Sequence, residues 1–475
     1  MTDHPDRQPM HRPINRRRFV GSSAAAAGAA VAASALPSLL TGCAPDAATA
    51  NRPKPSQSQL TWQRDELALF LHFGVNTYTD REWGDGTESP RIFNPRALDA
   101  RAWARTARAA GFRAMILTAK HHDGFCLWPT ATTPHSVASS PFRNGSGDVV
   151  REFIDACRAE GLRAGLYLSP WDQNAPVYGD SPRYNDMYEA QLTELLTRYG
   201  NIHEVWFDGA NGEGPNGKRQ EYDWPRIWGK VRELQPAAVM FSDAGPDVRW
   251  IGNERGVAGE TNWSTVDPSI VPVPGLSGDE VMRSLQEGDR GGSVWRPGET
   301  DVSIRPGWFY HPAENERVRS VDDLVGLYFS SVGRNSKLLL NVPPTREGLL
   351  HETDAARLLG MRAALDATFA ENLAEGGEYR WRPRRGGGGT ATVMLSTPRA
   401  VGIVDLREWI EDGQSVAAYA LEAHVNGTWQ QVATGTTVGY RRLLRIPSVT
   451  TDGLRVVVSD AEGPTGELRI GAFGP

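Results

Sequence analysis

Residues 103–120, WARTARAAGFRAMILTAK, predict an amphipathic helix that leads directly into a short buried strand. The apolar residues of the helix recur on one face, Gly111 is placed to end it, and residues 114–120 form an apolar run of strand length. A helix followed at once by such a run is typical of parallel β/α units, whose strands are covered by helices.

The same unit recurs over much of the chain. Residues 149–168, VVREFIDACRAEGLRAGLYL, repeat the order of helix, glycine and strand. Further strand-like runs lie at residues 67–74, 202–209, 239–243, 248–252 and 337–342. The alternation predicts a (β/α)8-like barrel, an α/β fold of the TIM type, over residues 61–375. Residues 261–306 are rich in Gly and Pro with little periodicity, so we expect a long loop that covers the site.

The C-terminal part of the chain has a different pattern. After residues 386–389, GGGG, apolar and polar residues alternate in short runs, such as GLRVVV at 453–458. Alternation with a period of two indicates strands that bury one face. Residues 376–475 are therefore predicted to form an antiparallel β-sandwich.

The N-terminal residues resemble an export signal. Residues 15–20, NRRRFV, place an arginine pair ahead of an uncharged, Ala-rich stretch. Residues 40–43, LTGC, resemble the lipoprotein box, in which Cys43 is acylated, and an ordinary cleaved leader is the alternative. We expect residues 1–43 to be a twin-arginine lipoprotein signal and residues 44–60 a linker. The protein would then lie on the outer side of a bacterial plasma membrane or in the periplasm, with the lipid as its only membrane contact.

Composition narrows the class of ligand. The net charge is −6 and no long basic run occurs, so we expect no nucleic-acid partner. After Cys43, only Cys126 and Cys157 remain, and we expect both to be free, buried thiols. The 15 tryptophans favour a carbohydrate ligand, because indole rings stack on the apolar faces of sugars.

Polar side chains lie near the carboxyl ends of the predicted strands, where the active site of such a barrel is found. These residues are His72, His121, His122, Tyr167 and Asp208. Because separate strand ends converge on one mouth, we expect the five side chains to share a site.

Asp208 is the strongest catalytic candidate, because an acid that directly follows buried strand residues lies at the barrel rim. A turn or capping role is the alternative. A retaining glycosidase needs a second carboxyl about 5 to 5.5 Å away, and Glu254 is our choice for it. Glu260 is the rival, whereas Asp243 and Asp247 are poorer candidates because Gly- and Pro-rich loops often use Asp in turns.

His121, His122 and Asp123 could also begin a metal site. Adjacent residues on an extended strand point to opposite sides, so the two rings would not easily reach one ion. We therefore expect no metal and no other cofactor. Hydrogen bonding to sugar hydroxyls is the preferred role for these side chains.

Six short segments lie in order between about residues 67 and 350. They are HFG at 72–74, EWGDG at 82–86, KHHDGF at 120–125, VWFDG at 205–209, GWFY at 307–310 and LLLNVPP at 338–344. Together they resemble the family 29 glycoside hydrolases, the α-L-fucosidases.

The resemblance implies a retaining mechanism in which Asp208 forms a covalent fucosyl ester, with Glu254 as acid/base and Glu260 still open. It also implies a fucose pocket formed by His72, Glu82, Trp83, His121, His122, Tyr167, Trp206, Arg249 and Trp308. Residues 82–88 resemble the subgroup that acts on α-1,3/1,4-linked fucose. The expected substrate is a fucosylated oligosaccharide or glycoconjugate. The alternatives are another retaining barrel glycosidase and an inactive carbohydrate-binding protein.

Overall fold

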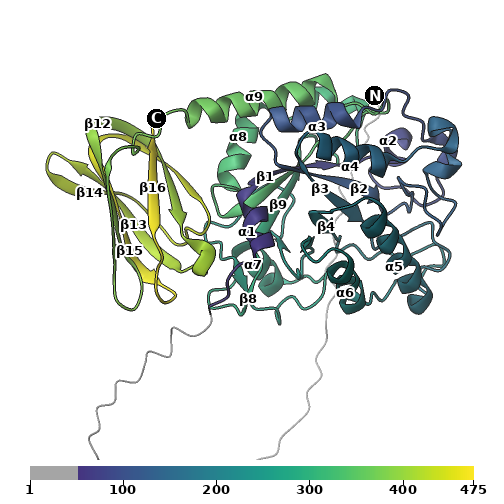
Figure 1. Cartoon of the computed structure of the whole chain (residues 1–475), viewed down its shortest axis with the longest axis horizontal. Helices are drawn as coiled ribbons and strands as arrows, with labels where there is room; N and C mark the ends of the chain where they lie inside the picture. The colour runs from purple at the N-terminus through teal and green to yellow at the C-terminus, as the bar shows by residue number, and fades with distance from the viewer. Residues whose placement is uncertain (1–51) are drawn as a thin grey trace, which may run out of the picture. The chain divides into compact units, whose positions relative to one another are not determined.

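Eight parallel strands form a nearly closed barrel in the computed structural model, which describes residues 52–475 (Figure 1). The strands are β1 (Leu67–Leu71), β2 (Ala114–Lys120), β3 (Arg163–Leu168), β4 (Glu204–Trp206), β5 (Val239–Phe241), β6 (Arg249–Trp250), β9 (Gly298–Ser303) and β10 (Ser336–Asn341). Their order is β5-β4-β3-β2-β1-β10-β9-β6, and an isolated bridge between Phe241 and Val248 joins the two ends. The predicted barrel is confirmed.

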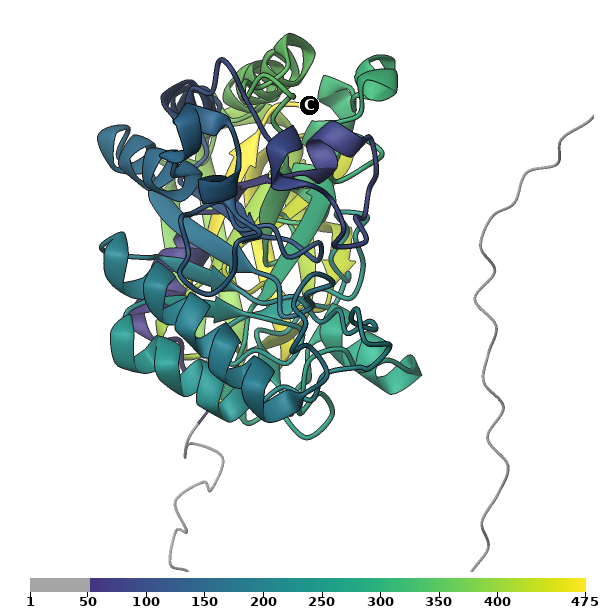
Figure 2. The ribbon, with the colours of Figure 1, turned by 90° about the vertical axis from the view of Figure 1, so that its right-hand side faces the viewer.

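Helices cover the outside of the barrel, as Figure 2 shows from the barrel side. They are α3 (Ala100–Ala109), α4 (Val149–Ala159), α5 (Ser181–Arg198), α6 (Trp224–Leu234), α8 (Val321–Ser330) and α9 (Glu352–Thr368). The side chains of Asp99, Asp148 and Asp223 accept hydrogen bonds from first-turn amides of α3, α4 and α6. Gly111 and Gly161 follow α3 and α4 with φ values of 88° and 70°, which suit glycine at a helix end.

The expected loop at residues 261–306 is wrong in part. The segment contains β7 (Thr265–Val266), α7 (Asp279–Glu287), β8 (Val294–Trp295) and the barrel strand β9. Two acids of β9, Glu299 and Asp301, accept hydrogen bonds from the indole groups of Trp206 and Trp250 inside the barrel. A strand whose inward residues are polar has no apolar run, and the sequence pattern therefore missed it.

Helix α1 (Gln57–Arg64) closes the amino-terminal end of the barrel, which we call the floor. The helix begins within the predicted linker, where the Ser56 side chain caps its first turn. Trp62 of α1 is fully buried and donates to Glu204 Oε2 at 2.9 Å, and Lys337 Nζ lies 2.9 Å from the same atom. Glu204 is the first residue of β4, so the floor is filled and the opposite end of the barrel is left for a site.

The C-terminal part forms the predicted antiparallel β-sandwich. Its strands are β11 (Glu378–Pro383), β12 (Gly389–Glu408), β13 (Val416–Val425), β14 (Thr428–Gly435), β15 (Arg442–Ala461) and β16 (Leu468–Phe473). They pair in the order β11-β12-β15-β13-β14, with β16 paired to β12. The register of β12 against β15 shifts twice along these long strands, which lets the sheet bend around its own apolar core.

Polar contacts join the sandwich to the barrel. Arg441 Nη1 donates to Glu66 Oε2 at 2.9 Å, and the backbone N–H of Tyr440 donates to Asn335 Oδ1 at 2.8 Å. Glu66 directly precedes β1, so these contacts lie near the floor and not near the carboxyl ends of the strands.

Shorter helical segments complete the structure. They are α2 (Asn76–Thr79) and the 3₁₀ turns Pro90–Ile92, Val137–Ser139, Phe142–Gly145, Pro312–Arg317 and Ile410–Asp412. Cys126 and Cys157 are buried and free, as predicted. Within residues 52–475, no helix has both the length and the apolar character needed to cross a membrane. The predicted signal, including Cys43, lies outside the described residues.

Candidate active site

A cavity of about 190 Å³ lies at the carboxyl ends of the barrel strands. It is lined by Phe70, His72, Trp83, His121, His122, Tyr167, Trp206, Asp208, Ala210, Glu254, Asp301 and Trp308. Nine of these twelve residues belong to the set singled out from the sequence, including both predicted catalytic carboxyls. The fold thus brings side chains from separate strands and loops to one site.

Asp208 lies just beyond β4, and both of its carboxylate oxygens are held. Tyr167 Oη donates to Oδ2 at 3.1 Å, and the backbone N–H of Ala210 donates to Oδ1 at 2.7 Å. His122 Nε2 lies 3.9 Å from Oδ2. These contacts fix the direction of the carboxylate, while 27% of its side chain stays exposed on the cavity wall.

Glu254 lies in the loop after β6 and faces the same cavity. Burial raises the pKa of its carboxyl, and the negative charges of Asp208 and Glu82 raise that pKa further. A hydrogen bond with the Trp308 side chain acts in the opposite direction. Glu254 is therefore an acid whose protonated form is favoured next to a carboxylate.

The other candidate acids lie elsewhere. Glu260 pairs with Arg442 at the contact between barrel and sandwich, and 64% of its side chain is exposed. Asp247 pairs with Arg232 at 2.7 Å. Asp243 is buried and accepts a hydrogen bond from a backbone amide, and burial raises its pKa to about 6. None of the three lines the cavity.

Three buried histidines form one wall of the cavity. His72 Nδ1 lies 2.8 Å from Asn341 Oδ1, and burial lowers the pKa of His72 to about 3. Burial also lowers the pKa values of His121 and His122 below the ordinary value of histidine. All three rings are therefore neutral at neutral pH, and each can donate one hydrogen bond and accept one.

The directions of His121 and His122 differ from the sequence-based expectation. We expected the two rings to point to opposite sides, but both line the cavity, with ring centroids 4.1 Å apart. They follow the last residue of β2, and the extended-strand geometry behind the expectation no longer holds there. Among the described residues, no group of three or more His, Cys, Asp or Glu side chains is arranged to hold a metal ion.

Aromatic side chains form the rest of the wall. The ring of Trp206 stacks on Phe241, with centroids 4.1 Å apart and an interplanar angle of 10°. Asn341 Nδ2 donates to the backbone carbonyl of Trp308 at 2.8 Å and so fixes that residue beside His72. Trp83 is different, because 62% of it is exposed at the mouth.

Two predicted pocket residues, Glu82 and Arg249, do not line the cavity. Glu82 accepts a hydrogen bond from the backbone N–H of Trp308 and lies 2.9 Å from His311 Nε2, so it supports the wall from behind. Arg249 begins β6 near the floor, where its three guanidinium nitrogens donate to Asn262 and to two backbone carbonyls. A buried cation with every nitrogen engaged there supports the fold, and the structure does not bring Arg249 to the cavity lining.

Three lining residues, Phe70, Ala210 and Asp301, were not singled out from the sequence. Phe70 lies on β1, two residues before His72 in the strand-like run 67–74, so the alternation of side chains could have placed it in the site. Ala210 contributes through its backbone, which sequence cannot show. Asp301 lies on β9, the strand that was not recognised.

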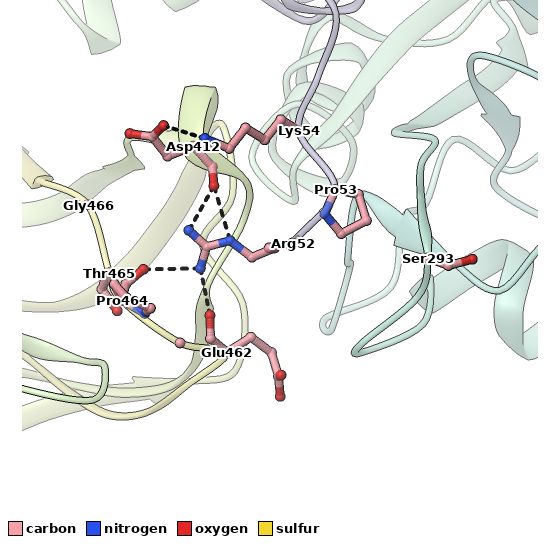
Figure 3. A pocket seen from close by; sticks show the side chains of 10 residues that line it. Arg52, Pro53, Lys54, Ser293, Asp412, Glu462, Pro464, Thr465 and Gly466 are labelled. Carbon is pink, nitrogen blue, oxygen red and sulfur yellow. Dashed lines mark hydrogen bonds and ion pairs between the residues drawn. The ribbon is translucent and has the colours of Figure 1, made fainter. Parts of the chain in front are cut away.

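A larger cavity of about 830 Å³ lies where residues 52–54 meet the sandwich (Figure 3). Arg52 donates to the backbone carbonyls of Glu462 at 2.6 Å and Asp412 at 2.9 Å, and Lys54 pairs with the Asp412 carboxylate at 3.0 Å. These polar groups attach the start of the described chain to the sandwich. We therefore assign this larger cavity a structural role.

Known proteins match this chain over nearly all of the described residues. Residues 61–368 match the family model described as Alpha-L-fucosidase. Alpha-L-fucosidase 1 of Arabidopsis thaliana is 43% identical over 438 residues, which cover 86% of this chain and 85% of that protein.

Solved structures share the fold. A Ruminococcus gnavus fucosidase of glycoside hydrolase family 29, in complex with fucose, has a TM-score of 0.80 at 32% identity, over 91% of this chain and 97% of its own. A family 29 member from an unknown rumen bacterium has a TM-score of 0.81 at 42% identity, over 89% of this chain and 77% of its own. By family model, sequence and fold, the chain belongs to the alpha-L-fucosidase family and is a glycoside hydrolase, an α-L-fucosidase.

Proposed function

We propose that this α-L-fucosidase acts with net retention, with Asp208 as the nucleophile and Glu254 as the acid/base. The observation that carries the proposal is the meeting of these two carboxyls at one cavity. Contacts aim Asp208 in a fixed direction, whereas burial and the charge of Asp208 favour the protonated form of Glu254. Two carboxyls held in different protonation states are what a double displacement requires.

In the first step, Asp208 attacks the anomeric carbon while Glu254 donates its proton to the glycosidic oxygen. The bond between these two substrate atoms breaks, the rest of the glycan leaves as an alcohol, and fucose becomes an ester of Asp208. In the second step, Glu254 takes a proton from water, the water oxygen attacks the anomeric carbon, and Asp208 leaves as a carboxylate. Two inversions at one carbon give net retention.

The charges around the cavity support this chemistry. The three histidines are neutral, and no lysine or arginine belongs to the lining. The carboxylate of Asp208 therefore meets the positive charge that develops on the sugar ring without competition from a protein cation. The histidines remain free to hydrogen-bond sugar hydroxyls.

The size of the cavity supports removal of a terminal sugar. At about 190 Å³, it is smaller than the roughly 300 to 1,000 Å³ of pockets that enclose drug-sized ligands, so it suits one sugar ring. The exposed Trp83 is placed to contact the next sugar. Because residues 82–88 also resemble the subgroup that acts on α-1,3/1,4-linked fucose, we infer that such linkages in oligosaccharides or glycoconjugates are the substrate.

We also propose that the enzyme acts outside the cytoplasm as a lipoprotein. Support comes from the arginine pair in residues 15–20 and from the LTGC box at 40–43. A Cys43→Ser variant should move from the membrane fraction to the soluble fraction. Equal membrane association of the variant and the wild type would contradict the lipid anchor.

The mechanism is tested by the stereochemistry of the products. Wild-type enzyme should release α-L-fucose first, as followed by NMR with an aryl fucoside. With azide, Asp208→Ala should give the β-fucosyl azide, because azide enters from the face that the nucleophile occupied. Glu254→Ala should give the α-fucosyl azide, because azide then attacks the covalent intermediate. β-L-Fucose as the first wild-type product, or a nearly active Glu254→Ala variant, would overturn the assignment.

A further inference from the structure

Asp301 is a third acid in the cavity, and the double displacement leaves it without a role. It lies on β9, in register with Leu339 of β10, and lines the cavity together with Asp208 and Glu254. Only 4% of the residue is exposed. A buried acid that borders a ligand cavity is a candidate for binding or catalysis.

Trp250 holds one side of this carboxyl. Its indole Nε1 donates to Asp301 Oδ1 at 2.7 Å, and no other side chain within residues 52–475 donates to Asp301. Because Asp301 lines the cavity, its carboxyl can also hydrogen-bond a ligand there. Burial of a carboxyl costs free energy, and a ligand hydroxyl that hydrogen-bonds it offsets part of that cost.

The surroundings of Asp301 favour its protonated form. Burial raises the pKa of the carboxyl well above its ordinary value, and the charges of Glu254 and Asp208 raise it further. A protonated carboxyl can donate a hydrogen bond as well as accept one. It also adds no further negative charge beside the Asp208 carboxylate.

We propose that Asp301 binds the fucose ring through a hydrogen bond between its Oδ2 atom and a ring hydroxyl, while Trp250 fixes the direction of the carboxyl. The proposal rests on the α-L-fucosidase activity of this site. His72 follows β1, and His121 and His122 follow β2, whereas Asp301 is on β9, so the sugar is held from two sides of the barrel. Contacts from two sides keep the anomeric carbon in line with the nucleophile.

The test pairs Asp301→Ala with substrates that lack one hydroxyl. Wild type and variant are assayed on an aryl α-L-fucoside and on its 2-, 3- and 4-deoxy analogues. Removal of the contacted hydroxyl should lower the wild-type kcat/KM by about ten- to hundredfold, since a buried polar group loses its partner. In Asp301→Ala that same loss should shrink to about threefold or less, because the two changes remove one hydrogen bond. The decreases in kcat/KM caused by removing either of the other two hydroxyls should be the same in Asp301→Ala as in the wild type.

Matched variants separate binding from support of the fold. Trp250→Phe removes the indole that directs the carboxyl but leaves the carboxyl in the cavity, so sensitivity to the hydroxyl should weaken without being lost. Asp301→Asn keeps a donor and an acceptor and should retain that sensitivity as well. Asp301→Ser is too short to reach the sugar and gives the same test if the alanine variant does not fold.

Two failures can be told apart. A wild-type enzyme that releases no fucose from the parent aryl fucoside would contradict the activity itself. The second failure concerns Asp301 only. If the wild type is active, and each deoxy analogue lowers kcat/KM as much in Asp301→Ala and Asp301→Ser as in the wild type, the proposed contact is wrong and the role of Asp301 is structural.

Discussion

The two ends of the barrel bury similar side chains and use them differently. At the floor, Lys337 Nζ lies 2.9 Å from Glu204 and 3.6 Å from Glu299, so two acids share a cation. At the mouth, three acids share a cavity that no lysine or arginine lines. Buried acids that are paired with a cation hold the fold together. Buried acids without one keep the potential that stabilises positive charge on a sugar.

Trp206 connects the two ends. Its ring lines the cavity, and its Nε1 donates to Glu299 Oε1 at 3.0 Å on the floor side. Burial and the charge of Glu204 raise the pKa of Glu299 well above its ordinary value, and Lys337 opposes that rise. Because the neutral form of Glu299 is favoured and Glu204 is paired with Lys337, the floor carries little net charge. The ends therefore differ in net charge more than in composition.

Replacing an acid by its amide changes the charge but hardly the shape of a side chain, and its effect on kcat/KM should differ most between the two ends of the barrel. Asp208→Asn should lower kcat/KM by roughly a thousandfold or more, since the amide cannot form the covalent ester. Glu299→Gln should lower it by less than about tenfold, because glutamine is neutral, as is the form of Glu299 that burial favours, and still accepts from Trp206. Initial rates on an aryl fucoside, with circular dichroism as a check of folding, measure both. Equal decreases in kcat/KM in the two variants would contradict the functional difference between the mouth and the floor.

Removal of the floor cation should affect stability and not catalysis. Lys337→Met leaves the Glu204 carboxylate buried without its partner, which should lower the free energy of unfolding by about 3 to 5 kcal/mol. Turnover per folded molecule should stay near that of the wild type. Chemical denaturation measures the loss.

Lys54→Met is the matched control for this variant. The partner of Lys54, Asp412, has a side chain that is 64% exposed, so this pair should contribute at most about 1 kcal/mol. Equal decreases in the free energy of unfolding of Lys337→Met and Lys54→Met would show that the buried ion pair at the floor contributes no more to stability than an exposed pair.

The smallest effect concerns pH. In its proposed role as the acid, Glu254 acts in its protonated form, so kcat/KM should fall as pH rises through the pKa of Glu254. The charge of Glu82 raises that pKa, and Glu82→Gln should therefore move the alkaline limb of the pH profile to lower pH. Glu260→Gln, whose carboxylate faces Arg442 instead, should leave the limb in place. A shift of the limb to higher pH in Glu82→Gln would contradict the role of Glu254 as the acid.

The sequence predicted the fold well where buried elements consist of apolar residues. Strands β1, β2 and β3 read as apolar runs, and helices α3 and α4 end at glycines. Asp208 could be found because it directly follows such a run, and Glu254 because it follows another strand of the same kind. Both lie at the cavity.

The errors arose where inward-facing residues are polar. β9 carries Glu299 and Asp301 on its inward face, and their partners, Trp206 and Trp250, are distant in sequence. Arg249 lies within a strand-like run, and the structure places it at the start of β6, away from the cavity lining. A linear pattern does not say which end of a short strand a residue occupies.

The join between β5 and β6 has consequences for how this chain can vary. Phe241 and Val248 form one bridge there, and the short segment between them holds no helix to cover it. Val271 and, from α7, Leu285 lie in the segment between β6 and β9 and pack at this join with Trp228 and Trp250. A change in length of that segment would thus alter the closure of the ring as well as the surface near the mouth. Diversification of this region is constrained by the integrity of the barrel itself.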